Sequence, residues 1–267
     1  MKIGLYQGPS PAGDCKSALA VVDRMLASAA NAGARMLLFP ELFLPGYNQP
    51  GLQKTLGQPV GGDWEQAFAR MCNQHGCGLT IGWAERDGDN LFNAASAFDD
   101  SGEKLAHYRK VQLYGPVEQQ TFSPGDAFST FEFENYRVAL LICYDVEFSR
   151  HVQALATEGV ELLLVPTANP AQFPHVHRAL VPARAAEAGL TIAYANLCGV
   201  EKNLTTHSGL PAGAVVAYGG GSLVVGPDAN PLVTAGAGET LLIADLDAVS
   251  EIDASIISTQ QHDYRDI

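Results

Sequence analysis

Basic residues are scarce in this sequence. It has 16 lysines and arginines against 29 aspartates and glutamates, which leaves a formal net charge of −13 over 267 residues. No basic patch or basic amphipathic helix offsets this charge. An acidic surface of this kind repels phosphate backbones and anionic lipids. We therefore expect neither a nucleic-acid partner nor a membrane partner.

Long hydrophobic runs are also absent. Residues 138–142 and 162–165 have the length of strands and fall far short of the ~18 apolar residues of a membrane-spanning helix. The first residues, Met1–Gln7, are too short and too polar for a secretory signal peptide and are typical of a strand. The five cysteines are an odd number spread thinly along the chain. This distribution predicts reduced thiols and a cytoplasmic protein.

A metal site is not predicted either. Cys72, His75 and Cys77 lie close together in the sequence. A structural zinc site, however, needs four ligands at established spacings, and no second pair of ligands lies nearby. We therefore expect no metal and no cofactor.

Apolar residues are abundant, at 47% of the sequence. Predicted strands alternate with predicted helices in both halves, which indicates layered α/β packing. Residues 33–40 (GARMLLFP) resemble residues 159–166 (GVELLLVP), and no Ser/Gly/Pro-rich linker separates the two segments. The sequence thus predicts a single domain over residues 1–267, made of two similar halves whose sheets pack on each other. The tail after about residue 250 has little pattern, and we expect it at an oligomer interface.

A buried strand leads directly into a cysteine. The apolar run 138–142 is followed by Cys143, and polar residues take over at once. A continuous apolar run of this length predicts a strand buried on both faces. In α/β sheets the carboxyl end of such a strand is where ligands and chemistry collect. Cys143 is therefore a candidate nucleophile, although a buried inert thiol is the alternative for any single cysteine.

Two further charged residues lie at predicted strand ends. Glu41 follows a buried strand that ends at Pro40, and Lys110 ends the second strand of a predicted hairpin. Each of the two alone would be typical of a solvated or surface-paired charge. Their joint placement with Cys143, at spacings of 69 and 33 residues, favours a shared catalytic role.

These three positions carry a resemblance to a known family. Residues 39–42 (FPEL), 108–111 (YRKV) and 142–145 (ICYD) resemble the three signature segments of the nitrilase superfamily of carbon–nitrogen hydrolases. The similarity extends from Ile3 to about Asp247 and includes residues 45–47, 122–125 and 165–169. It implies a four-layer αββα sandwich, usually paired into homodimers or larger homo-oligomers. It also implies a Glu41–Lys110–Cys143 triad and a second glutamate, Glu118, eight residues after the lysine.

The chemistry of such a triad follows from its groups. An amide is a poor electrophile, so a covalent step with a cysteine thiolate divides the barrier into two smaller ones. We expect Lys110 and the amino end of a helix that follows Cys143 to lower the thiol pKa. Glu41 would act as the base, and Lys110 with the backbone N–H of Tyr144 would stabilise the oxyanion. Glu118 would hold Lys110 or the substrate nitrogen in place. Asp145 and Glu147 are expected to be structural, by capping the next helix or by pairing with Arg150 or Arg184.

The residues after Cys143 narrow the predicted reaction. Cys-Tyr-Asp resembles the amidase and carbamoylase branches of the superfamily more than the Cys-Trp-Glu of nitrilases, and residues 141–148 resemble bacterial aliphatic amidases of the 5-aminovaleramide and R-selective kind. This resemblance predicts hydrolysis of a small aliphatic primary amide to a carboxylic acid and ammonia. N-carbamoyl amine hydrolysis is the nearest alternative, nitrile hydrolysis comes third, and a non-catalytic scaffold or binding protein of the same fold stays open. The candidate substrate-binding residues are Tyr47, Tyr114, Tyr144, Asn169 and Phe173.

Overall fold

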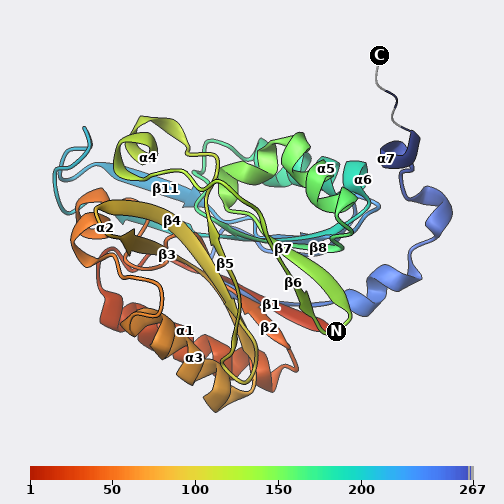
Figure 1. Cartoon of the computed structure of the whole chain (residues 1–267), viewed down its shortest axis with the longest axis horizontal. Helices are drawn as coiled ribbons and strands as arrows, with labels where there is room; N and C mark the ends of the chain where they lie inside the picture. Colours follow the sequence, from red (N-terminus) through yellow and green to blue (C-terminus); the bar gives the residue numbers. More distant parts are fainter. Residues whose placement is uncertain (264, 266–267) are drawn as a thin grey trace.

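The computed structural model describes residues 1–263 and 265. Two six-stranded sheets pack face to face, and helices cover the outer face of each (Figure 1). The two sheets share a core, in which Leu5 of the first sheet and Leu163 of the second are fully buried. This is the predicted αββα sandwich. Within the described residues, no helix combines the length and the apolar character that a membrane crossing requires.

The first sheet is built mainly from the amino-terminal half of the chain. Its strand order is β14-β1-β2-β3-β4-β5, in which β1 runs parallel to β2 and β2 to β3. The strands are β1 (Lys2–Gln7), β2 (Met36–Leu38), β3 (Gly78–Asp87), β4 (Asn90–Phe98), β5 (Lys104–Arg109) and β14 (Thr240–Asp245). Helices α1 (Cys15–Asn31) and α3 (Asp63–His75) cover its outer face (Figure 1). Asp14 caps α1 by accepting a hydrogen bond from the Ser17 N–H at 3.0 Å, as expected for an aspartate at this position.

The second sheet repeats this plan in the other half of the chain. Its order is β13-β12-β9-β8-β7-β6, with β7, β8 and β9 parallel. The strands are β6 (Ser129–Phe133), β7 (Tyr136–Leu140), β8 (Leu162–Thr167), β9 (Thr191–Asn196), β12 (Leu223–Val225) and β13 (Pro231–Thr234). Helices α5 (Ser149–Thr157) and α6 (Val181–Ala188) cover its outer face, and a π-helical turn, Val176–Leu180, precedes α6 (Figure 1). The two similar segments of the sequence, residues 33–40 and 159–166, contain β2 and most of β8. These are parallel interior strands of the two sheets.

The remaining elements lie at the two ends of the sandwich. At one end, left in Figure 1, are α2 (Pro50–Leu56), α4 (Gly115–Thr121) and the hairpin of β10 (Cys198–Lys202) and β11 (Val215–Gly219). At the other end the chain leaves β14 through two 3₁₀ turns, Leu246–Glu251 and Ala254–Ile256, and the short helix α7 (Gln260–Asp263). This tail extends away from the sheets (Figure 1). Its place at an oligomer interface stays a prediction.

Candidate active site

Glu41 lies in the turn that follows β2. The backbone of this turn packs against the neighbouring strand β3. A β-carbon at Gly82 of β3 would lie 2.6 Å from the Glu41 Cα and from the Leu42 backbone nitrogen. Only glycine therefore lets the two backbones approach so closely. As a result the Glu41 side chain is completely buried, although it carries a carboxylate. A buried carboxylate needs partners of opposite charge or hydrogen-bond donors.

Lys110 supplies that partner and binds a second carboxylate as well. It directly follows β5, and its side chain is fully buried. Its Nζ donates to Glu41 Oε1 at 2.6 Å and to Glu118 Oε1 at 2.9 Å. The glutamate eight residues after the lysine thus contacts it, as predicted for a residue that holds Lys110 in place. The three charges form one buried cluster of two acids around one base.

Asn93 of β4 completes the surroundings of Glu41. Its Nδ2 donates to Glu41 Oε1 at 2.7 Å, so this single oxygen accepts from both Asn93 and Lys110. The other oxygen, Glu41 Oε2, is buried and has no hydrogen-bond partner among the described residues. Buried polar atoms are rarely left unpaired in native proteins, and an exception calls for an explanation. Here it leaves one carboxylate oxygen available to a thiol or a bound molecule.

Cys143 stands beyond the carboxyl end of β7, in the loop that leaves the second sheet. It begins a 3₁₀ turn, Cys143–Glu147, and its φ of +46° places it in the left-handed region. Non-glycine residues adopt this region rarely, and such strain is concentrated at functional sites. The following residue, Tyr144, lies in the first turn, where backbone N–H groups have no acceptor within the helix. The role of its N–H as an oxyanion donor stays a prediction.

Asp145 holds this turn in place by the predicted capping contact, which is its bond from the Ile142 N–H, and by two contacts that the sequence did not predict. Its carboxylate accepts from the Ile142 N–H at 3.1 Å, the Gln112 N–H at 2.7 Å and the Tyr108 hydroxyl at 2.8 Å. The expected structural role is present, but the expected partners, Arg150 and Arg184, are not its partners. Arg184 instead binds Glu187 and the backbone oxygen of Glu147.

The charges of the cluster set the protonation states. Burial raises the pKa of Glu41 to about 7, against the lowering effect of Lys110. Burial lowers the pKa of Lys110, but the carboxylates of Glu118 and Glu41 outweigh it and hold that pKa well above its ordinary value. Burial and the Glu41 charge raise the pKa of Cys143 well above the usual range, while Lys110 and the Ala168 backbone N–H oppose the rise.

The expectation of an acidified thiol is therefore wrong. The α-helix after the cysteine, α5, begins only at Ser149, so its amino end is not adjacent to the sulfur. The cation at Lys110 is present, but burial outweighs it. Cys143 rests as a neutral thiol, and its proton must pass to a base when it reacts.

A cavity of ≈ 150 Å³ opens beside Cys143. All five candidate substrate-binding residues lie in its wall, together with the half-buried Cys143: Tyr47, Tyr114, Tyr144, Asn169 and Phe173. The Tyr114 ring contacts those of Tyr144 and Phe173, with centroids 5.3 and 6.2 Å apart. Asn169 donates its amide to the backbone oxygen of Phe173 at 3.0 Å, so it shapes the wall. Ala168, Glu147 and His175 also line the cavity.

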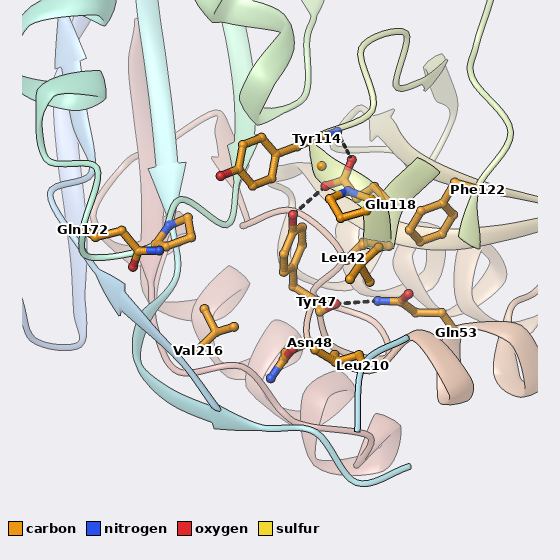
Figure 2. Close-up of a pocket in the computed structure, with 14 residues that line it drawn as sticks. Leu42, Tyr47, Asn48, Gln53, Tyr114, Glu118, Phe122, Gln172, Leu210 and Val216 are labelled. Atoms are coloured by element: carbon orange, nitrogen blue, oxygen red, sulfur yellow. Dashed lines mark hydrogen bonds between the residues drawn. The ribbon is translucent and has the colours of Figure 1, made fainter. Parts of the chain in front are cut away.

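Two of these tyrosines are tied to the charged cluster. The Tyr47 hydroxyl donates to Glu118 Oε1 at 2.6 Å, and the Tyr114 backbone N–H donates to Glu118 Oε2 at 2.8 Å (Figure 2). Glu118 in turn binds Lys110. A chain of hydrogen bonds thus connects the wall of the cavity to the Lys110–Glu41 pair, and the charges of both residues act on the Cys143 thiol.

Comparison with known proteins agrees with this arrangement. The family described as carbon-nitrogen hydrolase matches residues 2–254. The chain belongs to this family. It is 31% identical over 264 residues to an (R)-stereoselective amidase of a Pseudomonas species, which covers 99% of this chain and 90% of that protein. It is 34% identical over 251 residues to a hydrolase in the pqqF 5′ region of Pseudomonas protegens, at 92% and 83% coverage.

Solved structures of amidases share the fold of this carbon–nitrogen hydrolase. An amidase variant from Nesterenkonia sp. AN1 superposes with a TM-score of 0.86 at 35% identity, over 99% of this chain and 96% of that one. That structure shows acrylamide added to the active-site cysteine. Another variant of the same amidase was solved with butyramide, at a TM-score of 0.84 and 34% identity. The chain is thus placed among the amidases of the nitrilase superfamily.

Three residues at the site of this carbon–nitrogen hydrolase were not predicted as site residues. Asn93, Glu147 and His175 contact Glu41 or line the cavity. Asn93 was detectable in principle, because it is a polar residue within the mainly apolar strand β4. Glu147 and His175 had no such signal, since charged residues are common in loops. In the described part of the chain, no three His, Cys, Asp or Glu side chains are placed to hold a metal ion, and His75 binds Asp23 at 2.7 Å.

Proposed function

We propose that this protein hydrolyses a small aliphatic primary amide to a carboxylic acid and ammonia, with Cys143 as the nucleophile. The observation that carries the proposal is the unpaired Glu41 Oε2. Glu41 Oε1 is held by Lys110 and Asn93, so the carboxylate is fixed in orientation and has one oxygen left to accept a proton. Cys143 is a neutral thiol and requires such a base.

The first half of the reaction forms a thioester. Glu41 Oε2 takes the thiol proton while the Cys143 sulfur attacks the amide carbon. The carbonyl oxygen becomes an oxyanion, stabilised by Lys110 Nζ and the backbone N–H of Tyr144. Glu41 then passes the proton to the amide nitrogen, the C–N bond breaks and ammonia leaves. An acyl group remains bound to the sulfur.

The second half regenerates the enzyme with the same residues. Glu41 takes a proton from water, and the resulting hydroxide attacks the thioester carbon. The C–S bond breaks, the sulfur recovers a proton from Glu41, and the carboxylic acid is released. A carboxyl group with a pKa near 7 suits both directions of transfer at neutral pH. Glu118 does not exchange protons in this scheme, but holds Lys110, Tyr47 and the Tyr114 backbone.

The size of the cavity supports a small substrate. Cavities that bind drug-sized molecules have volumes of roughly 300–1,000 Å³, whereas the cavity beside Cys143 has ≈ 150 Å³. The related amidase that was solved with butyramide supports the same size class. Aromatic rings of Tyr114, Tyr144 and Phe173 provide apolar contact for a short acyl chain.

Ammonia release from a panel of short amides tests the proposal. We expect turnover of propionamide and butyramide by the wild type and none by Cys143→Ala. Cys15→Ala is the matched control, because Cys15 is also free and half-buried but lies on α1, away from the cavity. Turnover by Cys143→Ala would refute the nucleophile assignment. Turnover of N-carbamoyl amines or nitriles, with none of amides, would refute the choice of substrate.

A covalent probe gives an independent readout. Acrylamide should add to Cys143 and appear in the mass spectrum of the intact protein as one adduct. The adduct should be absent from Cys143→Ala and unchanged in Cys15→Ala. Labelling of Cys143→Ala at the wild-type rate would contradict the proposal even if no substrate were known.

A further inference from the structure

A second cavity lies directly beside the first. It has a volume of ≈ 220 Å³ and is drawn in Figure 2. Its walls come from the turn after β2, from α2 and α4, from residues 170 and 172, and from the β10–β11 hairpin and its loop. Its apolar wall residues are Leu42, Val117, Phe122, Leu210 and Val216. No step of the proposed reaction uses this space.

Several polar groups in its wall are already hydrogen-bonded, whereas the Tyr114 hydroxyl and the Gln172 side chain have no hydrogen-bond partner among the described residues. Asn48 Nδ2 donates to two backbone oxygens, both at 3.1 Å. Gln53 Nε2 also donates to two backbone oxygens, at 2.7 and 2.8 Å. Both oxygens of Glu118 accept hydrogen bonds from the tyrosines described above. The bonded atoms offer a ligand no further hydrogen bonds, and most of the lining is apolar. An occupant therefore gains from this cavity mainly by burying apolar surface.

The two cavities share a wall. Tyr47, Tyr114 and Pro170 line both of them. Tyr47 is fixed, because its hydroxyl is bound to Glu118 and its ring packs against Tyr218 with centroids 6.3 Å apart. Tyr114 is held less firmly, since its side chain is 38% exposed and its hydroxyl makes no hydrogen bond within the described residues. Tyr114 is thus the less constrained of the two tyrosines in the shared wall.

We propose that the second cavity is a subsite for the acyl tail of the amide substrate. The inference rests on the proposed function: a primary amide releases only ammonia, so the acyl group is the one part of it that can extend beyond the reaction cavity. The two cavities together enter the volume range of sites for larger ligands. The substrate class is thus an aliphatic amide with an unbranched or lightly branched apolar tail, which reaches past Tyr114.

Chain length provides the first test. For the wild type, kcat/KM should rise from propionamide to hexanamide by about fourfold for each methylene that the second cavity buries. Val216→Trp and Leu210→Trp fill the cavity from different parts of its wall. Each should lower the hexanamide-to-propionamide ratio of kcat/KM by tenfold or more. Val200→Trp is the matched control, since Val200 lies on the same hairpin but is 67% exposed and lines neither cavity; its ratio should equal that of the wild type.

The outcomes separate the inference from the function on which it rests. A wild-type ratio that does not rise with chain length, or an unchanged ratio in folded Val216→Trp and Leu210→Trp, overturns the subsite. If Val216→Trp does not fold, the hexanamide-to-propionamide ratio of Leu210→Trp tests the subsite. If N-butylacetamide rather than hexanamide loses turnover in these variants, the cavity takes the nitrogen substituent and the acyl assignment is wrong. Absence of turnover with propionamide itself would instead refute the proposed amidase function.

Discussion

Replacing Lys110 by methionine isolates the contribution of one buried ammonium. Methionine has a similar length but no charge, so Glu41 and Glu118 would lose their shared cation. In the wild type, Lys110 Nζ lies 2.6 and 2.9 Å from their oxygens, with the side chain fully buried. The variant would hold two buried carboxyl groups near each other, and at least one of them must bind a proton near neutral pH.

The structure allows the size of the effect to be worked out. Loss of one oxyanion donor lowers kcat by about 10²–10³-fold. Removal of one partner from a buried ion pair costs about 3–5 kcal/mol of folding stability. For a chain of this length that corresponds to a fall in Tm of roughly 10 °C. The Glu41 pKa, already raised to about 7, should rise further without Lys110, so the pH dependence of the remaining activity should move toward alkaline pH.

The assays are ammonia release from propionamide between pH 5 and 9, and thermal unfolding. Lys104→Met is the control, because Lys104 lies on β5, the strand that Lys110 directly follows, and pairs with Glu65 at 3.0 Å but is 33% exposed. Glu65 keeps hydrogen bonds from Ser96 and the Gly61 N–H in that variant, so we expect a smaller loss of folding stability than in Lys110→Met, and wild-type kcat. A Lys110→Met enzyme with wild-type kcat and an unmoved pH profile would refute the placement of Lys110 in the reaction.

Three further predictions concern the surroundings of this cluster. Since burial raises the Glu41 pKa to about 7 and the base must be ionised, wild-type kcat/KM should rise with pH up to about 7 and then level off; a profile flat from pH 5 would contradict this. Tyr47→Phe removes the donor to Glu118 and should lower kcat about tenfold or more in the ammonia assay; unchanged turnover would show the bond to be dispensable. Asp145→Ala leaves three buried donors unpaired and should lower the free energy of unfolding by about 3 kcal/mol or more in urea titration, and a wild-type midpoint would refute that account.

The helix after Cys143 shows where reasoning from the sequence was incomplete. The helix expected directly after Cys143 would have placed its amino end at the sulfur. The structure instead has a 3₁₀ turn and a separate α5 that begins at Ser149. The Asp145 carboxylate turns back to the Ile142 N–H and to Tyr108 and Gln112 from the other half of the chain. The contact with Ile142 is local, but the contacts with Tyr108 and Gln112 depend on the assembled fold, and no local sequence pattern predicts them.

Asn93 and the second cavity were not predicted for the same reason. Asn93 lies on β4, and its partner Glu41 is 52 residues away in the sequence. The second cavity combines residues from the turn after β2, from α2 and α4 and from the β10–β11 hairpin. Its volume depends on how these segments pack, which composition and periodicity do not specify. The protonation state of Cys143 likewise depends on burial, which the sequence had not indicated.

The amino-acid sequence by itself predicted buried strands in layered α/β packing and the positions of Glu41, Lys110 and Cys143 at strand ends, because burial of an apolar run and its interruption by a polar residue are local properties of the chain. The αββα class was implied by the family resemblance. Only the tertiary structure decided that Glu41 keeps one oxygen unpaired, that the thiol is neutral, and that a second cavity adjoins the first. These properties depend on how closely segments far apart in the sequence approach each other in the fold, because both desolvation and charge–charge interactions depend on that approach.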